Sequence, residues 1–465
     1  MAKETLKSIP LSENQTFEIE ITSMAYDNSA VGRYKDFVVF VDRAAPGDKV
    51  LAQATTLRHN YARAKILEVQ GSDPLYRIEA KCKVFKVCGG CQWQHLPYEK
   101  QLEQKNILIA DFLKTLNISS DQIKPIIPSP DIWNYRNKVQ YPVRTIQETG
   151  RLKAGYFEWH SNELVNIKHC PIQNNLFDEI IEAVRNIAEK YKIIAYDSST
   201  KKGWLRHICV RLGINTGEAL LTLVGVDLGL SNSQMFVSEL MGKFPQLVGV
   251  CINVNNQTTN VIYGNKTEVL KGKGYINEIV NGIKFKISAT SFFQVNTLQT
   301  EKLLSTISDL LQLSGEEVLV DAYCGVGLIS LYMAKFVKKV IGIEEIKQSI
   351  EDAKTSLQEN NINNVILING KVENKIQQGI ETYKPEVIIL DPPRGGCAKN
   401  ILNTICDSDV RKIIYVSCNP STLIRDLNIL CLGESNQRGF SIKTIQPIDM
   451  FPHSYHTECI VLLER

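Results

Sequence analysis

The sequence predicts an α/β protein in three parts: a small β-barrel, an α+β central region, and a C-terminal domain with helices on both faces of a largely parallel sheet. Three observations lead to this prediction. Short runs of alternating apolar and polar residues, separated by turns, fill residues 16–70. Prolines 125, 128 and 130 interrupt every periodic pattern. From about residue 297, apolar strands alternate with helices. We therefore place the parts at residues 10–70, 71–285 and 286–465.

The composition is that of an ordinary globular protein. Of 465 residues, 44% are hydrophobic and 22% are charged, which is close to average usage. No apolar stretch reaches the roughly 18 residues of a membrane span. The first fifteen residues, MAKETLKSIPLSENQ, contain no hydrophobic signal core. We therefore expect a cytoplasmic protein, and its net charge of +3 is too balanced to indicate a nucleic-acid partner by itself.

The barrel is predicted from strand-like runs at 17–21, 37–41, 49–52 and 62–67. Closing such short strands into a barrel removes their exposed edges. A cysteine-bearing connector follows, then an amphipathic helix near 98–116, and the prolines indicate a linker. Residues 131–285 contain strands and a helix near 175–191, in a mixed pattern that does not resolve further.

The C-terminal part is predicted to be a doubly wound, Rossmann-like domain. A helical stripe over 303–311 precedes buried-type strands, which we expect at 318–320, 340–343, 365–368, 387–390 and 413–416. The runs 440–445 and 459–463 have no long helix between them, so we expect an antiparallel pair there.

A glycine-bearing turn, residues 321–327 (DAYCGVG), follows the first of these strands. Its two glycines let the backbone approach a ligand at the carboxyl edge of the sheet. The next strand ends in Glu344, where a carboxylate can accept hydrogen bonds from ribose hydroxyls. The turn is acidic and lacks a third glycine, so a sulfonium cation suits it better than a pyrophosphate does. S-adenosylmethionine is favoured over NAD, and an ordinary tight turn is the alternative.

Two further strand ends carry residues 391–394 (DPPR) and 417–420 (SCNP). The prolines keep the chain extended as it leaves the sheet. Asn419 and Pro420 are suited to the N-cap and first position of a helix over 421–430. A helix N-terminus favours a thiolate, so Cys418 is a candidate nucleophile, and a buried, inert cysteine is the alternative.

Three thiols, Cys82, Cys88 and Cys91, surround a Gly-Gly pair, and Cys170 is a candidate fourth. Clustered cysteines in a reducing compartment are metal ligands or nucleophiles more often than disulfides. The C-x2-C spacing indicates a metal site without separating zinc from iron–sulfur. We expect the histidines of the segment 449–458 to shape a loop, and we interpret six other cysteines as packing residues: Cys209, Cys251, Cys397, Cys406, Cys431 and Cys459. Cys324 receives no chemical role.

Five motifs in order resemble the RNA (uracil-5-)methyltransferase family: residues 291–296 (SFFQVN), 321–327, 391–394, 417–420 and 449–458 (DMFPHSYHTE). In that family the strand-end cysteine is the nucleophile and the glutamate of the closing motif is the general base. The resemblance implies these roles for Cys418 and Glu458. It also implies that four residues line the pocket for S-adenosylmethionine and the target base: Gln294, Tyr323, Glu344 and Asp391.

The chemistry of uracil requires such a set. Carbon 5 is too weak a nucleophile to take a methyl group until a thiolate adds to carbon 6. A base must then remove the proton on carbon 5, and the nucleotide must be flipped out of its stack. A DNA adenine methyltransferase would be expected to carry an aromatic residue where Arg394 stands, and the Pro-Cys pair of DNA cytosine methyltransferases is absent.

The resemblance extends to the first two parts. Cys82, Cys88, Cys91 and Cys170 match, in order, the ligands of a 4Fe-4S cluster in the ribosomal-RNA branch of the family. Residues 29–33, 37–41 and 45–50 resemble the TRAM domain, an oligonucleotide-binding-type barrel. We therefore expect a monomer that methylates 23S ribosomal RNA and has no membrane or DNA partner. A transfer-RNA uracil-5-methyltransferase and a non-catalytic RNA-binding iron–sulfur protein are the alternatives.

Two regions have a composition suited to RNA contact. Residues 58–63 (RHNYAR) interleave cations with an aromatic side chain. Residues 131–215 hold 13 Lys and Arg against 9 Asp and Glu, including the runs 135–138 (YRNK) and 204–207 (WLRH). A solvated surface has much the same composition.

Overall fold

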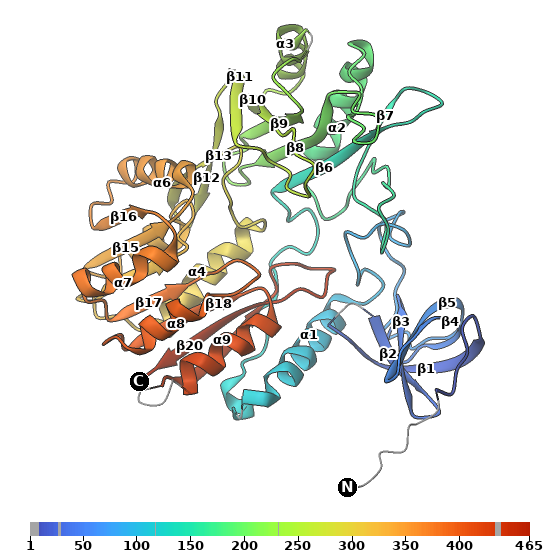
Figure 1. Ribbon diagram of the computed structural model, residues 1–465, viewed down its shortest axis with the longest axis horizontal. Coiled ribbons are helices and arrows are strands. Elements are labelled where there is room, and N and C mark those ends of the chain that lie inside the picture. Colours follow the sequence, from blue (N-terminus) through green and yellow to red (C-terminus); the bar gives the residue numbers. More distant parts are fainter. Residues whose placement is uncertain (1–8, 27–28, 117, 231, 433–438) are drawn as a thin grey trace.

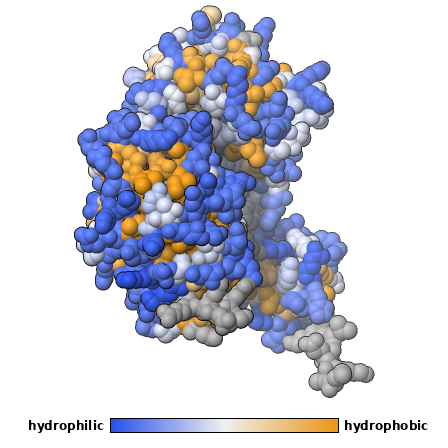
Figure 2. All heavy atoms as spheres, turned by 60° about the vertical axis from the view of Figure 1, so that its left-hand side comes forward, coloured by the Kyte–Doolittle hydropathy of each residue, from blue (hydrophilic) through white to orange (hydrophobic). Residues whose placement is uncertain are grey.

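The computed structural model describes residues 9–26, 29–116, 118–230, 232–432 and 439–465. Figure 1 shows the barrel beside α1, the central sheet above, and the large C-terminal sheet with its helices. In the space-filling view the barrel is a separate lobe beside the larger body, and the face shown is mostly hydrophilic (Figure 2). Among the described residues, no helix has both the length and the apolar character that a bilayer span requires.

The N-terminal strands form a closed barrel in the order β1-β2-β3-β5-β4. Alternating side chains point inward, as in Phe37–Asp42, where every second residue is buried. Gly32 has no room for a side chain, because a Cβ there would lie 2.4 Å from the carbonyl oxygen of Glu20. The strands are β1 (Thr16–Met24), β2 (Ser29–Tyr34), β3 (Phe37–Asp42), β4 (Lys49–Leu57) and β5 (Tyr61–Gly71).

The connector leads into α1 (Tyr98–Leu113), followed by the short helices η1 (Lys114–Leu116) and η2 (Ser120–Gln122). α1 lies between the barrel and the C-terminal domain (Figure 1). The prolines after it do not produce a free linker. Ile123 and Ile127 form parallel bridges with Ile445 and Ile448, so this segment is attached to the outer edge of the C-terminal sheet.

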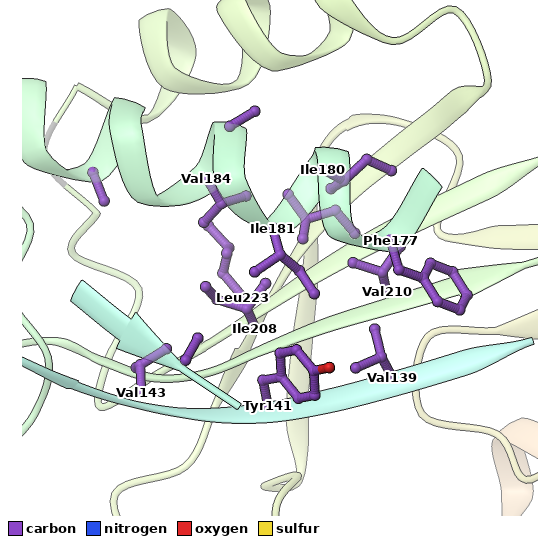
Figure 3. Close-up of a cluster of buried hydrophobic side chains, with 14 of the residues drawn as sticks. Val139, Tyr141, Val143, Phe177, Ile180, Ile181, Val184, Ile208, Val210 and Leu223 are labelled. Atoms are coloured by element: carbon purple, nitrogen blue, oxygen red, sulfur yellow. The ribbon is translucent and has the colours of Figure 1, made fainter. Parts of the chain in front are cut away.

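The central region, which the sequence left unresolved, is a six-stranded sheet in the order β11-β10-β9-β8-β6-β7. The apolar side of α2 packs on one face, with Phe177, Ile181 and Val184 directed toward Tyr141 and Val210 (Figure 3). The elements are β6 (Lys138–Thr145), β7 (Leu152–Ala154), α2 (Asn175–Lys190), β8 (Leu205–Leu212), β9 (Ala219–Gly225), α3 (Ser233–Lys243), β10 (Leu247–Val254) and β11 (Lys266–Gly272).

The other face of this sheet connects to the C-terminal domain. Leu220 and Cys251 pack in the same core cluster as Phe285 of the hairpin β12 (Tyr275–Val280) and β13 (Ile283–Ser288). All seven residues of β9 are therefore buried, as expected of a strand that is covered on both faces. This shared core joins the two regions.

The C-terminal sheet has seven strands in the order β16-β15-β14-β17-β18-β20-β19. The five predicted parallel strands are present, and β19 and β20 form the predicted antiparallel pair. β20 also pairs antiparallel with β18, which was not predicted. The strands are β14 (Val318–Ala322), β15 (Lys339–Glu344), β16 (Val365–Asn369), β17 (Val387–Leu390), β18 (Lys412–Ser417), β19 (Ser441–Ile448) and β20 (Glu458–Glu464). The helices are α4 (Thr297–Leu311), α5 (Leu328–Met333), α6 (Lys347–Glu359), α7 (Val372–Tyr383), α8 (Lys399–Cys406) and α9 (Pro420–Leu432).

Candidate active site

The candidate site lies at the carboxyl edge of the C-terminal sheet, where the strand order changes direction. β14 stands between β15 and β17, so the chain continues to one side after β14 and to the other after β16. Ligands of open α/β sheets bind at such switch points. Four predicted motifs meet there because each follows or ends one of the strands β14, β15, β17 and β18.

A small pocket opens at this edge. Gln294, Tyr323 and Asp391 line it. Glu344 lies behind the glycine turn, where its carboxylate accepts hydrogen bonds from the backbone N–H groups of Gly325 at 2.9 Å and Ile346 at 2.7 Å. A carboxylate has about four acceptor positions, so these two bonds leave capacity for a ligand.

The glycine turn has an unusual backbone. Tyr323, Gly325 and Gly327 have φ values of 69°, 56° and 81°, and a left-handed conformation is uncommon for a residue such as tyrosine. At Gly327 a Cβ would also lie 2.5 Å from Leu331 Cδ1, so that the leucine side chain would have to move. The turn therefore brings its backbone to the pocket in a shape that few other sequences could adopt.

Two carboxyl groups, that of buried Asp321 and that of half-buried Asp391, make the wall of the pocket acidic. Asp321 accepts a hydrogen bond from the Ser330 hydroxyl at 2.5 Å, while its Oδ1 atom has no partner among the described residues. Burial raises the pKa of each carboxyl to about 7. A positive charge in the pocket would lower both values and stabilise the carboxylates, so the site fits a sulfonium ligand.

The register of two strands brings Cys418 and Glu458 together. Ser417 pairs with Cys459 in the antiparallel ladder of β18 and β20. The next positions along the two chains are Cys418 and Glu458, so they lie side by side at the end of this ladder. Cys418 is half-buried and Glu458 is buried.

The surroundings of Cys418 and Glu458 oppose the ionisation of both side chains. Burial, with Glu458 next in importance, raises the pKa of the Cys418 thiol to about 11. Burial and Asp391 raise the pKa of Glu458 to about 8. Arg394 acts against both shifts. Burial and the neighbouring carboxyl groups therefore favour the thiol, opposite to the thiolate expected at the start of α9.

The four predicted ligand cysteines share one cavity elsewhere. A small cavity is lined by Cys82, Cys88, Cys91 and Cys170. Burial raises the pKa of each thiol, and cation binding would have to displace those protons. Within the described ranges, no three His, Cys, Asp or Glu side chains are arranged to hold a single metal ion. Of the six cysteines interpreted as packing residues, all are buried except half-buried Cys431.

Comparison with known proteins agrees with the geometry. Residues 10–67 match the TRAM domain, and residues 253–465 match the family described as tRNA (Uracil-5-)-methyltransferase. An uncharacterized RNA methyltransferase of Bacillus cereus is 38% identical over 461 residues, or 98% of each chain. The chain belongs to the RNA (uracil-5-)methyltransferase family. A relative from Clostridium acetobutylicum, also described as an uncharacterized RNA methyltransferase, is 38% identical over 465 residues and 99% of each chain.

A solved structure resembles this methyltransferase over almost its whole length. It is that of the Pyrococcus abyssi tRNA (uracil-54, C5)-methyltransferase in complex with S-adenosyl-L-homocysteine. The two share 25% identity and a TM-score of 0.75, covering 96% of this chain and 99% of the other. The predicted fold, a Rossmann-like S-adenosylmethionine-dependent methyltransferase domain preceded by a TRAM barrel, is confirmed.

Part of one predicted RNA-contacting run lies inside this methyltransferase. The run 135–138 was described as suited to RNA contact, but Tyr135 and Asn137 are buried, whereas Arg136 and Lys138 are half-buried. Tyr135 donates a hydrogen bond to the carbonyl of Pro452 at 3.2 Å, and Asn137 donates to the carbonyl of Gln294 at 2.9 Å. These side chains support two active-site motifs. A cationic and aromatic run has the same appearance in sequence whether it is buried or exposed.

α1 of the methyltransferase carries a buried polar face that was not predicted from the sequence. Gln101, Gln104 and Lys105 are buried together with Leu108. They stand at positions i, i+3, i+4 and i+7, which is the spacing of a core-facing helical stripe. Polar residues at such positions were the available signal. Gln101 and Lys105 contact the segment before Glu458, whereas Gln104 accepts a hydrogen bond from the Met24 N–H of the barrel.

Proposed function

We propose that this enzyme transfers a methyl group from S-adenosylmethionine to carbon 5 of a specific uridine in 23S ribosomal RNA through a covalent adduct on Cys418. The observation that carries the proposal is the ladder register that sets Cys418 beside Glu458, next to a pocket with an acidic wall. A nucleophile and a base are the two groups that the reaction requires.

In the proposed reaction, the Cys418 thiolate adds to carbon 6 of uracil, and the electron pair of the C5–C6 double bond moves to oxygen 4 as an enolate. Carbon 5 takes the methyl group, and the electron pair of the broken methyl–sulfur bond stays on the sulfur of the donor. Glu458 then accepts the proton from carbon 5. The electrons of that C–H bond re-form the double bond, and Cys418 leaves as a thiolate.

Several pocket residues are proposed to hold the two substrates. S-adenosylmethionine and the target base would be bound by Gln294, Tyr323, Glu344 and Asp391. The carboxyl groups of Asp321 and Asp391 would attract the sulfonium charge. Phe292 lines the same pocket with 59% of its surface exposed. A flipped base can stack on an exposed ring of this kind, so we assign Phe292 to the uracil.

We expect the methylation rate to increase with pH around pH 8. Glu458, with a pKa of about 8, and Cys418, with a pKa of about 11, both react in their deprotonated forms. Raising the pH therefore increases the reactive population of each. Because Arg394 lowers both pKa values, Arg394→Gln should move the rising part of the profile to higher pH. Single-turnover rates measured from pH 6 to pH 10 give this profile.

Arg411→Gln is the matched control for that experiment. Arg411 precedes the amino end of β18, away from the ladder end that carries Cys418, so its loss should leave the pH profile unchanged. A profile for Arg394→Gln that coincides with the wild-type profile would show that Arg394 does not influence the reacting groups.

The proposed RNA target rests on the first two parts of the chain. We assign RNA binding to the TRAM barrel, within residues 10–70, and to the central part, residues 71–285, which also bears the four cysteines. This combination supports the ribosomal-RNA branch. The second candidate is transfer RNA, which the similarity to the Pyrococcus abyssi enzyme favours.

Mapping 5-methyluridine in RNA from a deletion strain separates these targets. We expect 23S ribosomal RNA to lose the modification at the target site and transfer RNA to keep its own. A plasmid copy of the wild-type gene should restore the modification, and a Cys418→Ser copy should not. Loss from transfer RNA alone would contradict the ribosomal target.

We also propose that Cys82, Cys88, Cys91 and Cys170 hold a 4Fe-4S cluster, for which four thiolates are the usual ligand set. Support comes from their shared cavity and from Gly90, whose N–H donates to the Cys88 sulfur at 3.3 Å. Among the described residues, none lines both this cavity and the methyl-transfer pocket. We therefore assign the cluster a structural or RNA-positioning role.

Metal content tests this assignment. Protein purified without oxygen should be brown and should contain about four irons per chain. Cys170→Ser should lower the iron content strongly, whereas Cys431→Ser, which alters a half-buried cysteine on α9, should not. Zinc as the only tightly bound metal in protein from iron-replete cells would contradict the cluster.

A further inference from the structure

The nine residues 449–457, here called the 449–457 loop, join β19 to β20 and end immediately before Glu458. Hydrogen bonds from the N-terminal third of the chain hold this loop. They come from the backbone amides of Gln92 and Trp93 and from the side chains of Tyr98, Gln101, Lys105 and Tyr135. Figure 1 shows the loop, in red, extending from the sheet toward the connector before α1.

The strongest of these contacts is a buried ion pair. The Lys105 ammonium lies 2.6 Å from the Asp449 carboxylate, and both side chains are fully buried. Lys105 also donates to the carbonyl of Phe451 at 3.2 Å, and Asp449 accepts from the Tyr98 hydroxyl at 2.9 Å. A buried pair with additional hydrogen bonds tolerates little displacement of either partner.

The position of Asp449 relates this pair to the active site. Asp449 directly follows Ile448, and Ile448 is the cross-strand partner of Glu458 in the ladder of β19 and β20. Lys105 therefore fixes the chain one residue away from the partner of Glu458. A shift of Asp449 would move the Glu458 carboxylate relative to Cys418.

A second set of contacts joins the loop to the cysteine-bearing connector. Gln101 accepts a hydrogen bond from the His453 backbone N–H at 2.8 Å, and its amide nitrogen lies 3.1 Å from His453 Nδ1. The His453 carbonyl accepts from the backbone amides of Gln92 at 2.9 Å and Trp93 at 3.0 Å. Gln92 directly follows Cys91 in the chain, so the cysteine cavity and the loop share one hydrogen-bonded segment.

We infer that Lys105 is a positioning residue for proton abstraction: through Asp449 it holds Glu458 where the carboxylate can reach the proton on carbon 5. The inference rests on the proposed role of Glu458 as the base. It also gives the connector a part in the reaction, because Gln92, Trp93 and Gln101 hold the same loop. A pair that only stabilised the fold could be replaced by uncharged residues without a selective effect on this step.

The test is a single-turnover experiment with the full chain and RNA whose target uridine carries either hydrogen or deuterium at carbon 5. The variant Lys105→Met/Asp449→Asn removes both charges together. We expect methyl transfer to change less than about 3-fold and resolution of the adduct to slow by about 10-fold or more. The rate ratio between the two RNAs should rise above the wild-type ratio, and a methylated protein–RNA adduct should accumulate on denaturing gels.

Two further variants keep the test decisive. Gln101→Met removes the contacts with His453 without leaving a buried charge, and it should change the rate ratio in the same direction by a smaller factor. Lys100→Met, on the same helix, removes a surface pair with Glu103 and should behave as wild type. If the folded double variant and Gln101→Met both keep the wild-type ratio and form no adduct, the inference is overturned.

Glu458→Gln is measured in parallel. Absence of adduct in that variant would remove the proposed base itself. Adduct in Glu458→Gln but in neither Lys105→Met/Asp449→Asn nor Gln101→Met would overturn only the positioning role.

Discussion

Cys418→Ser should reduce methylation by roughly 10⁴- to 10⁶-fold, the size of loss seen when an enzyme nucleophile is removed. The serine hydroxyl stays protonated near neutral pH and adds poorly to carbon 6 of uracil. Cys418 does not line the pocket assigned to S-adenosylmethionine, so the affinity for the methyl donor should remain near the wild-type value. Single-turnover methylation and calorimetric titration measure these two quantities.

Cys406→Ser is the control for loss of a buried thiol elsewhere. Cys406 is buried at the end of α8, apart from the motifs that meet at the sheet edge, and its replacement should leave turnover near the wild-type value. If Cys418→Ser kept a comparable turnover, the covalent mechanism would be wrong.

The parallel strands of the C-terminal sheet could be predicted from the sequence, because each strand and the turn after it are recognisable from a short run of consecutive residues. Each parallel strand is a short apolar run followed by a turn, and parallel strands place those turns at one edge. Residues 321–327 and Asp391 therefore meet without any knowledge of side-chain contacts. The same rule places Cys418 at that edge. Its position beside Glu458 could not be predicted, because it depends on the pairing of β20 with β18 and not on the predicted pair of β19 and β20.

The contacts that hold the active-site loop could not be predicted in the same way. Lys105 and Asp449 are 344 residues apart. The residues around each of them in the sequence do not indicate that the two side chains form a pair. A lysine in an amphipathic helix is normally solvated. Only the spacing of Gln101, Gln104 and Lys105 on one helical face indicated that these residues are buried.

The ionisation of Cys418 also depends on the fold. The motif around Pro420 indicates a helix N-terminus, and α9 does begin there. Burial and the neighbouring Glu458 raise the pKa of the Cys418 thiol. Glu458 lies beside Cys418 because β18 and β20 pair in an antiparallel ladder. The residues of this site can be identified in the sequence. Whether the pKa of Cys418 is raised or lowered depends on neighbours that only the fold brings together.

Glu458→Gln should stop the reaction after methyl transfer. Glutamine keeps the shape of the buried side chain but cannot accept the proton from carbon 5, so the adduct should collapse about 10²- to 10⁴-fold more slowly. A covalent protein–RNA complex that carries the transferred methyl group should therefore accumulate as a denaturation-resistant band. Radiolabelled methyl donor identifies the methyl group in that band.

Two control experiments test whether the adduct of Glu458→Gln arises from the loss of a base. Wild-type enzyme given RNA with 5-fluorouridine should form the same kind of complex, because carbon 5 then carries no proton to remove. Glu464→Gln, at the other end of β20 in a pair with Lys412, should not. The alternative role for Glu458 is to order the terminal strands, in which case Glu458→Gln would lose stability or RNA affinity without building up adduct.

A folded Glu458→Gln variant that binds RNA but forms no adduct would place the base elsewhere. Asp391 would then be the next candidate, because it lines the same pocket and is close enough to raise the pKa of Glu458. Its own pKa of about 7 would leave a large fraction ionised at neutral pH. Asp391→Asn should then accumulate the methylated adduct that Glu458→Gln fails to form.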